Sequence, residues 1–309
     1  MKKIYLSSIV SDEYIFKSIV MHDTLESTGC DFHLFLLCVV DEVYNILSKM
    51  GWENVTLLRL NEIENSELLG AKINRTYLEY CWTLKPAMLY YVIDNYSDAD
   101  YYAHIDADTC FWSSPEQIFD EAPDASEFLT DHNNSPRFLY TYDLTGRFNT
   151  GFVGAKNDLV GKGAVAWWRA ETIKWCYTAN DTTNKLFGDQ RHVERWPSIF
   201  PNIHVVSSPG ANTAFWNVEK YSVSQRDDGV YIDNSKLVFY HFSAVYIYNA
   251  KEFNLNWAYQ LPENVVQIIY LPYLTLLSRA IEKVQAIQPG FSKGFSPRGI
   301  VPEMHYFRL

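Results

Sequence analysis

The chain has 309 residues, 48% of them hydrophobic, which is enough for one large core or two modest ones. This composition excludes a disordered chain, a collagen-like chain and a small scaffold held by disulfides. The formal net charge of -11 argues against a general nucleic-acid-binding protein, because neutralising phosphates takes a surplus of Lys and Arg. A negatively charged ligand would have to be met locally, for instance by a bound cation.

The first hundred residues alternate between apolar strand patterns and amphipathic helix patterns. The predicted elements are a strand over Ile4–Val10, a helix over 13–26, a strand over 32–39, a helix over 43–50 and a strand over 55–60. A helix over 84–95, with Lys85 and Pro86 in its first turn, leads into a strand over Tyr101–Ile105. This alternation is typical of an α/β sheet with helices packed on its faces.

Beyond residue 105 the pattern is less regular. We predict a short helix in SSPEQIFDE, a strand over Phe148–Lys156, a helix over 158–177, a short helix over 190–196, a loop over 207–218 and a strand over 237–242. The sheet pattern stops near Asn249 and a helical stretch follows over 262–284, so we place a boundary between a core, 1–248, and a helical appendage with its tail, 249–309.

The location is predicted from the cysteines and the apolar stretches. Five widely spaced cysteines without a CxxC pair predict neither a disulfide framework nor a zinc site and fit a reducing cytoplasm. The opening MKKIYLSSIV is too short for a signal-peptide core, and the apolar stretch over 265–277 is too interrupted for a membrane span. Near the end, basic residues interleave with aromatic ones, and either a packed tail or peripheral contact with the inner membrane surface explains them.

An acidic turn follows the strand Tyr101–Ile105. The segment YYAHIDADTCFW places Asp106 and Asp108 where that strand ends, and ligands bind at the carboxyl ends of strands in α/β sheets. Two carboxylates there can hold Mn²⁺ or Mg²⁺ and leave positions for diphosphate oxygens. An Asp-x-Asp triplet alone is weak, because chance gives one on the order of every ~300 residues.

Two other segments support the acidic turn as a ligand site. His241 ends the apolar run LVFYHF, and its imidazole is a candidate third metal ligand, with a satisfied core histidine as the alternative. In RFNTGFVGAK, Asn149 offers an amide to sugar hydroxyls or serves a turn, and Gly151 inside a strand marks a close approach of backbone and ligand.

In order and spacing these segments resemble the GT-A glycosyltransferases, in particular the glycogenin and lipopolysaccharide-galactosyltransferase group and bacterial nucleotide-diphospho-sugar transferases. The resemblance covers roughly residues 4–242 and rests on the segments WTLKPAMLYY, HIDADTCFWSSPEQIFDE, FNTGFVGA, FGDQRHVERWP and FYHF. It implies a Rossmann-like mixed sheet flanked by helices, with residues 1–248 as the nucleotide-sugar-binding catalytic domain.

The resemblance also assigns roles. It makes Asp106, Asp108 and His241 the metal ligands, and places Lys85 at the donor diphosphate or sugar, where a lysine in a first helical turn would add its charge to the free backbone N–H groups. Asn149 and Gly151 would line the sugar pocket. Asp189 and Gln190, matching the family's DQ pair, would touch the transferred sugar near its reacting carbon, whereas the alternative for Asp189 is an exposed residue at a helix start.

This chain departs from the family at both ends of the site. Its first strand continues into SSIVSDEY, which offers Ser8 and Tyr14 to the nucleoside in place of an acidic pair, and the closing HxxGxxKPW segment is replaced by FSAVYIYN after His241. The loop SSPGANTAFWNV resembles one in bacterial relatives, where Asn212 and Trp216 would bound the sugar site, and His132 is a similar candidate.

The implied activity is transfer of a hexose from a nucleoside-diphosphate sugar, with UDP favoured, to a glycan, glycolipid or protein acceptor, for instance in polysaccharide biosynthesis. The family favours retention of configuration. Two rival hypotheses stay open: a haloacid-dehalogenase-like phosphatase with Asp106 as its nucleophile, because HIDADT fits DxDxT after a strand, and a non-catalytic sugar-binding relative.

Overall fold

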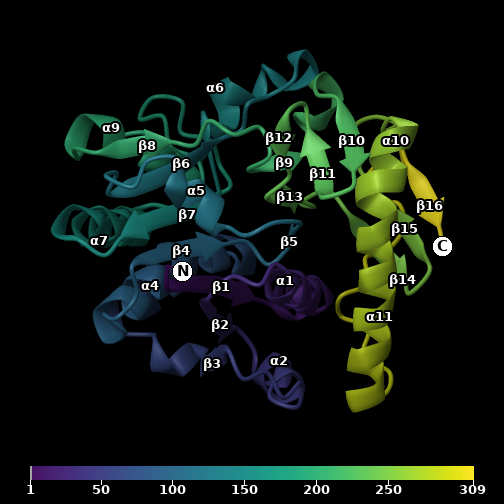
Figure 1. The fold of residues 1–309 in the computed structure, drawn as a ribbon. Coiled ribbons are helices and arrows are strands. Elements are labelled where there is room, and N and C mark those ends of the chain that lie inside the picture. Colours follow the sequence, from purple (N-terminus) through teal and green to yellow (C-terminus); the bar gives the residue numbers. More distant parts are fainter. Residues whose placement is uncertain (1) are drawn as a thin grey trace.

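A seven-stranded mixed sheet forms the centre of the molecule in the computed structural model, which describes residues 2–309 (Figure 1). Its strands are β1 (Ile4–Val10), β2 (Phe32–Cys38), β3 (Val55–Arg59), β4 (Tyr101–Ile105), β6 (Glu127–Asp131), β7 (Phe148–Lys156) and β8 (Ile203–Val205), in the spatial order β3-β2-β1-β4-β7-β6-β8. The strands β3, β2, β1 and β4 are parallel, and β7 runs antiparallel to both β4 and β6.

Helices cover both faces of this sheet. Alternation along β1 sends Ile4 and Leu6 into one core and Tyr5 into the other. The first core lies under α1 (Ile15–Ser27), α2 (Asp41–Leu47) and α11 (Leu271–Ile287), and the second lies under α3 (Ser66–Lys72), α4 (Tyr77–Asn95) and α7 (Leu159–Lys174). The predicted α/β class, a mixed sheet flanked by helices, is confirmed.

Shorter elements complete the chain. The short helices are α5 (Glu116–Asp120), α6 (Thr141–Thr145), α8 (Gln190–Val193) and α9 (Trp196–Ile199), and the short strands are β5 (Thr109–Phe111), β9 (Thr213–Ala214), β10 (Val223–Arg226), β11 (Gly229–Ile232), β12 (Ser235–Lys236) and β13 (Phe239–His241). The strand β13 lies between β5 and β9 in a small sheet beside the central one (Figure 1). This small sheet joins the turn after β4 to a segment more than a hundred residues later.

Several predicted elements have the predicted bounds, but one helix does not. β1, β4 and β7 begin and end where the sequence indicated. The helix predicted over 84–95 is α4, which begins at Tyr77, so the placement of Lys85 and Pro86 in a first turn was wrong. The true start is a capping box between Thr76 and Glu79, whose side chains each accept a backbone N–H of the other residue. Pro86 was misread as a start signal and instead lies inside the helix.

The C-terminal region packs against the rest of the molecule. It contains α10 (Glu263–Val265), a π-helical turn η5 (Val266–Tyr270), α11, and a three-stranded sheet of β14 (Tyr246–Asn249), β15 (Glu252–Asn254) and β16 (Tyr306–Arg308) that the sequence did not predict. By length and composition the helical stretch Glu263–Ile287 is long and apolar enough to cross a membrane, contrary to the prediction from its interruptions, and half of its most apolar window is buried in the structure.

The tail after α11 is held by packing and ion pairs. Phe291 and Phe295 pack against Phe16 of α1, at ring distances of 5.8 and 5.5 Å. The cationic side chains Lys293 and Arg298 pair with nearby carboxylates. The division at residue 248 and a membrane contact of this tail stay predictions.

Candidate active site

A cavity of about 370 Å³ opens where β1 and β4 end. The end of β1 and the turn that follows form one wall, α4 forms a second, and the acidic turn with His241 forms a third. Its lining residues are Ile9, Ser11, Glu13, Tyr14, Tyr77, Leu78, Cys81, Trp82, Lys85, Asp106, Ala107, Asp108, Asn149, Thr150, Phe187, Gly188, Asp189, Gln190, Trp216, His241 and Ser243. This is the edge of an α/β sheet at which ligands are expected.

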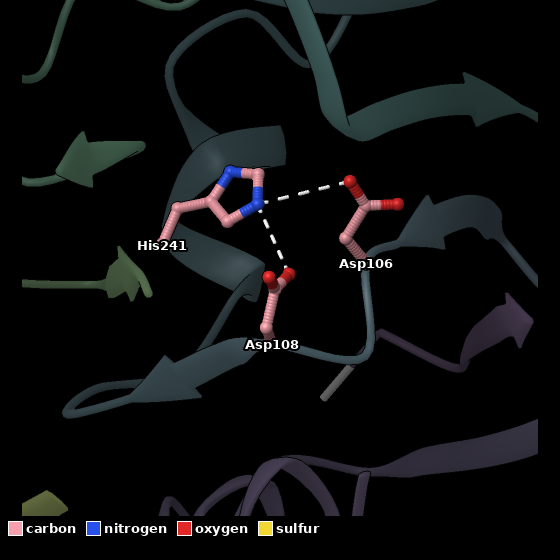
Figure 2. Close-up of side chains that lie close together, drawn as sticks. All are labelled: Asp106, Asp108 and His241. Atoms are coloured by element: carbon pink, nitrogen blue, oxygen red, sulfur yellow. Dashed lines mark ion pairs between the residues drawn. The ribbon is translucent and has the colours of Figure 1, made fainter. Parts of the chain in front are cut away.

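Asp106, Asp108 and His241 converge in this cavity, with potential ligand atoms that all lie within 4.8 Å of one another (Figure 2). The Nε2 atom of His241 is 3.1 Å from Asp108 Oδ1 and 3.7 Å from Asp106 Oδ2. Backbone pairing brings them together, because β13 runs antiparallel to β5 with His241 opposite Thr109. In addition, the N–H of Phe242 donates to the carbonyl of Asp108 at 2.8 Å.

A chain of hydrogen bonds sets the tautomer of His241. The carbonyl of Arg147 can only accept, so His132 Nδ1 donates to it at 3.1 Å, and its Nε2 accepts from the amide nitrogen of Asn149 at 3.5 Å. Burial lowers the pKa of His132 to about 4, so its ring is neutral at pH 7, as this arrangement requires. The Asn149 Oδ1 atom accepts the N–H of Gly151 at 3.1 Å and therefore also accepts from Nδ1 of His241 at 3.2 Å.

The consequence is that Nδ1 of His241 carries a proton and bonds to Asn149, so Nε2 is the ring nitrogen that faces the two carboxylates. An outer amide oxygen that accepts the other ring N–H is the usual support of a metal-binding histidine. The residues present therefore fit a divalent cation with oxygen and nitrogen ligands.

Gly151 leaves the room that this histidine needs. A bulge in β7 opposite Leu129 and Thr130 locally bends the strand, and a Cβ built at Gly151 would lie 2.5 Å from Cε1 and 2.6 Å from Nδ1 of His241. Gly151 is therefore behind the histidine and does not itself line the cavity. Trp216 holds the ring from another side, in an edge-on contact with a centroid distance of 5.3 Å.

Asp106 is held by two basic side chains. The ammonium of Lys85 lies 2.7 and 3.0 Å from its two oxygens, and Nε2 of His104 lies 3.0 Å from Oδ1. Burial would raise the pKa of Asp106, but Lys85, with His104 and His241, outweighs burial and keeps the pKa well below its usual range. Burial likewise opposes the charge of Lys85, but Asp106 and Asp189 raise the pKa of Lys85 above its ordinary value. The pair is therefore charged at neutral pH.

Asp108 has its own buried cation. Nζ of Lys17, from the first turn of α1, lies 3.8 Å from Asp108 Oδ2, while the other oxygen faces His241. Burial would raise the pKa of Asp108, and His241 together with Lys17 lowers it below its usual value. Both carboxylates of the acidic turn are thus ready to bind a cation without first losing a proton.

Asp189 and Gln190 lie at the start of α8 and line the cavity. Asp189 is buried, accepts the hydroxyl of Thr150 at 2.6 Å and lies 3.9 Å from the ammonium of Lys85, so the alternative of an exposed helix-start residue was wrong. The indole N–H of Trp168 donates to its carbonyl at 2.9 Å. Gln190 donates to the carbonyl of Thr145 at 2.6 Å and still lines the cavity.

The structure divides the predicted site residues into two groups. Those that line the cavity are Tyr14, Lys85, Asp106, Asp108, Asn149, Asp189, Gln190, Trp216 and His241. The other predicted residues, Ser8, His132, Gly151 and Asn212, lie behind this lining. The side-chain amide of Asn212 donates to the backbone carbonyl of Asp131 at 3.2 Å. The backbone carbonyl of His132 accepts the indole N–H of Trp216 at 3.0 Å. These two residues therefore support the wall from behind the cavity lining.

Sequence reasoning missed other residues of the site. The aromatic side chains of Trp82 and Phe187, 5.8 Å apart, form part of the wall beside Gly188, and His104 and Lys17 contact the two aspartates. For Lys17 there was a signal. A single lysine within the apolar run YIFKSIVM predicts a buried charge with a partner, because lysine is almost never fully buried alone.

The mixed sheet, the Asp-x-Asp turn at the end of β4 and the cavity beside it define the GT-A class of fold. The galactosyltransferase LgtC, solved in complex with donor and acceptor sugar analogs, has the same fold, with a TM-score of 0.56 over 90% of this chain and 96% of that chain at 10% identity. An active-site mutant of LgtC gives a TM-score of 0.53 over 78% and 87% of the two chains, also at 10% identity. The predicted resemblance to the lipopolysaccharide-galactosyltransferase group is confirmed for the fold.

The chain belongs to the family of the uncharacterized protein YfnD of Bacillus subtilis (strain 168), with which it shares 49% identity over 310 residues, covering all of both chains. The protein YfnF of the same organism is 27% identical over 298 residues, which cover 94% of this chain and 97% of YfnF. No protein-family model matches the chain.

Proposed function

We propose that the chain is a metal-dependent glycosyltransferase that moves a sugar from a nucleoside-diphosphate sugar to a glycan, glycolipid or protein acceptor. The observation that carries this proposal is the convergence of His241 Nε2 with the carboxylates of Asp106 and Asp108 in a cavity at the carboxyl end of β4. The GT-A fold supports it, since LgtC has this fold and its structure holds donor and acceptor sugar analogs.

The reaction breaks the bond between the anomeric carbon and the leaving diphosphate, on which negative charge develops. A bound divalent cation, Mn²⁺ or Mg²⁺, would stabilise that charge, and Asp106, Asp108 and His241 would hold it. Lys85 lies beside Asp106 and lines the cavity, so its ammonium can also contact the diphosphate. Because Lys85 is already charged and fixed, it needs little rearrangement as the leaving group departs.

The transferred sugar would lie between the acidic turn and α8. We assign Asp189 and Gln190 to the stabilisation of an oxocarbenium-like state, and Asn149 to hydroxyl groups of the sugar. The hydrogen bond from Thr150 and the ammonium of Lys85 keep Asp189 in place. We favour retention of configuration, with a leaving phosphate oxygen accepting the acceptor's proton, and a UDP-hexose as donor.

A thermal-shift screen tests the proposal. UDP, CDP, GDP, ADP and dTDP, and their commercially available sugar conjugates, are each added with and without Mn²⁺. We expect at least one nucleotide to stabilise the protein only when the metal is present, because a ligand that binds the folded state raises the melting temperature by mass action. Release of nucleoside diphosphate from the corresponding sugar donor then measures turnover.

Matched variants make this test specific. His241→Ala is expected to lose the metal-dependent shift, whereas His33→Ala, which removes a half-buried imidazole bonded to Thr56 at 2.8 Å and outside the cavity lining, is expected to keep it. The proposal is refuted if no nucleotide gives a metal-dependent shift, or if His241→Ala gives the same shift as the unaltered protein. Turnover of an aryl phosphate that is lost in Asp106→Asn would instead identify a phosphatase.

A further inference from the structure

Lys17 is a buried residue whose ammonium forms an ion pair with Asp108 and, among residues 2–309, makes no side-chain hydrogen bond. Its side chain is 8% exposed, and among residues 2–309 its nearest acidic atom is Asp108 Oδ2 at 3.8 Å, beyond hydrogen-bond range. It lies 4.8 Å from the ring centre of Tyr14, which lines the cavity. An ammonium has three N–H groups to satisfy, and largely burying one whose ion pair is as long as 3.8 Å is costly. A lysine in this position therefore needs a reason other than packing.

The charges around the acidic turn suggest that reason. Among residues 2–309, Lys85 is the lining residue with a fixed positive charge, while Asp106, Asp108 and Asp189 are buried or half-buried acids in the same lining. These three carboxylates and the nearby lysines form the charged centre of the site. With Lys85 alone the centre has a net charge of -2 (one minus three), and with Lys17 added it has a net charge of -1 (two minus three). Glu13 also lines the cavity, but its side chain is exposed to solvent and is screened.

This difference of one charge changes which ligand the centre favours. Without Lys17, a divalent cation would bring the net charge of the centre to zero. The centre would then bind the metal alone well and would have no remaining attraction for an anion. With Lys17, the same cation leaves the centre at +1, which favours a negatively charged diphosphate as the second ligand. In a buried site such charge differences are weakly screened and are felt strongly.

We propose that Lys17 is a positioning residue whose buried positive charge makes the acidic turn bind a divalent cation together with a diphosphate in preference to the cation alone. The inference rests on the proposed function, because it presumes a metal and a diphosphate ligand. Lys17 acts through Asp108. Its ammonium lies beside Oδ2 of Asp108, which leaves Oδ1 to face His241 and the cation. Among residues 2–309, Lys17 and Lys85 are the lysines within 4 Å of the carboxylates of Asp106, Asp108 and Asp189.

Binding measurements on Lys17→Met test this, because the variant removes the charge and keeps a long unbranched side chain. Mn²⁺ alone is titrated by electron paramagnetic resonance, and the nucleoside diphosphate that most stabilises the unaltered protein is titrated at saturating Mn²⁺. We expect Lys17→Met to bind Mn²⁺ alone more tightly and the nucleoside diphosphate more weakly, each on the order of tenfold. Lys17→Arg, which keeps the charge, is expected to behave as the unaltered protein in both titrations.

The opposite signs of the two changes separate this role from a structural one. A local distortion of the acidic turn would weaken both ligands, and a lysine that serves only packing would change neither, so either outcome overturns the inference. Lys17→Gln is measured in parallel and must show the same opposite changes, so that the test does not depend on one variant folding. If the unaltered protein binds neither Mn²⁺ nor any nucleoside diphosphate, the proposed function itself fails. Normal binding by the unaltered protein, without opposite changes in the variants, overturns only the role of Lys17.

Discussion

Gly151→Ala is the substitution for which the structure gives the most direct expectation. The added Cβ would lie 2.5 Å from Cε1 and 2.6 Å from Nδ1 of His241, and 2.8 Å from Oδ1 of Asn149. Carbon atoms in contact need about 3.5 Å, so the imidazole must move by roughly 1 Å. The ring cannot move toward the acidic turn, since Nε2 is already 3.1 Å from Asp108 Oδ1.

Two costs follow from this displacement. Overpacking of a tight interior is expected to destabilise the protein by about 1–3 kcal/mol. Displacing a metal-binding ring and its supporting amide is expected to lower Mn²⁺ affinity by roughly 10- to 100-fold. A misplacement of about 1 Å at a reacting centre can lower turnover by on the order of 100-fold. The loss of metal affinity is therefore specific to this site, whereas a loss of stability is expected wherever a tight interior is overpacked.

Gly154→Ala is the matched control, because it adds the same atom to the same strand. Its Cβ would meet the rings of Phe119 and Phe152 at 2.9 and 3.2 Å, away from the histidine. We expect both variants to melt at lower temperature in the absence of ligand, and only Gly151→Ala to lose the additional stabilisation by Mn²⁺ and nucleotide. If Gly151→Ala keeps the metal affinity of the unaltered protein, the supporting role of Gly151 for His241 is refuted.

Three further outcomes are expected. Burial and nearby Asp158 raise the pKa of Glu127 well above its usual range. The folded state therefore keeps a proton that the unfolded state releases, and the free energy of unfolding should fall by up to about 1.4 kcal/mol per pH unit above about pH 4.3. Glu127→Gln should abolish this fall in thermal melts from pH 4 to 8. Burial would raise the pKa of Glu79, but backbone N–H groups lower it to about 2. Glu79→Ala should lower the free energy of unfolding by about 1 kcal/mol at pH 7 in denaturant titrations. This difference between the variant and the unaltered protein should shrink below about pH 4, where Glu79 begins to bind a proton. His132→Phe removes the acceptor for the Asn149 amide and should weaken Mn²⁺ binding by roughly tenfold, measured by titration with the folded state verified by circular dichroism.

The sequence predicted β1, β2, β3, β4 and β7 of the central sheet, which are apolar runs with clear ends, and it missed β6 and β8. Ile4–Val10 and Tyr101–Ile105 lie in the middle of a sheet with cores on both faces, which requires such runs. The start of α4 was missed because Pro86 resembles a first-turn proline, while the actual signal, Thr76 followed by Glu79, was passed over. Local patterns thus predicted apolar buried strands correctly, but they did not decide between two competing signals for the start of a helix.

Its place at a strand end made His241 a candidate third ligand and the family resemblance assigned it to Asp106 and Asp108, but nothing local relates positions 108 and 241. The convergence of these side chains depends on the pairing of β13 with β5, a contact between segments far apart in the chain. The distinction between lining and supporting residues was out of reach for the same reason. Whether His132 reaches a ligand or stands behind Asn149 depends on side-chain packing among three strands and a loop.

The supporting residues explain why a weak motif can make a specific site. An Asp-x-Asp turn recurs by chance, and a histidine with two tautomers would present Nε2 as a lone pair only part of the time. Here the choice is made by a backbone carbonyl, which cannot change its role: Arg147 fixes His132, His132 fixes the amide of Asn149, and Asn149 fixes His241. Reversing the tautomer of His241 would leave at least one of these buried groups without a partner, at a cost of about 1–3 kcal/mol. Nε2 is therefore already the ring nitrogen directed at the acidic turn before any ligand arrives, and binding need not supply the free energy to turn the ring.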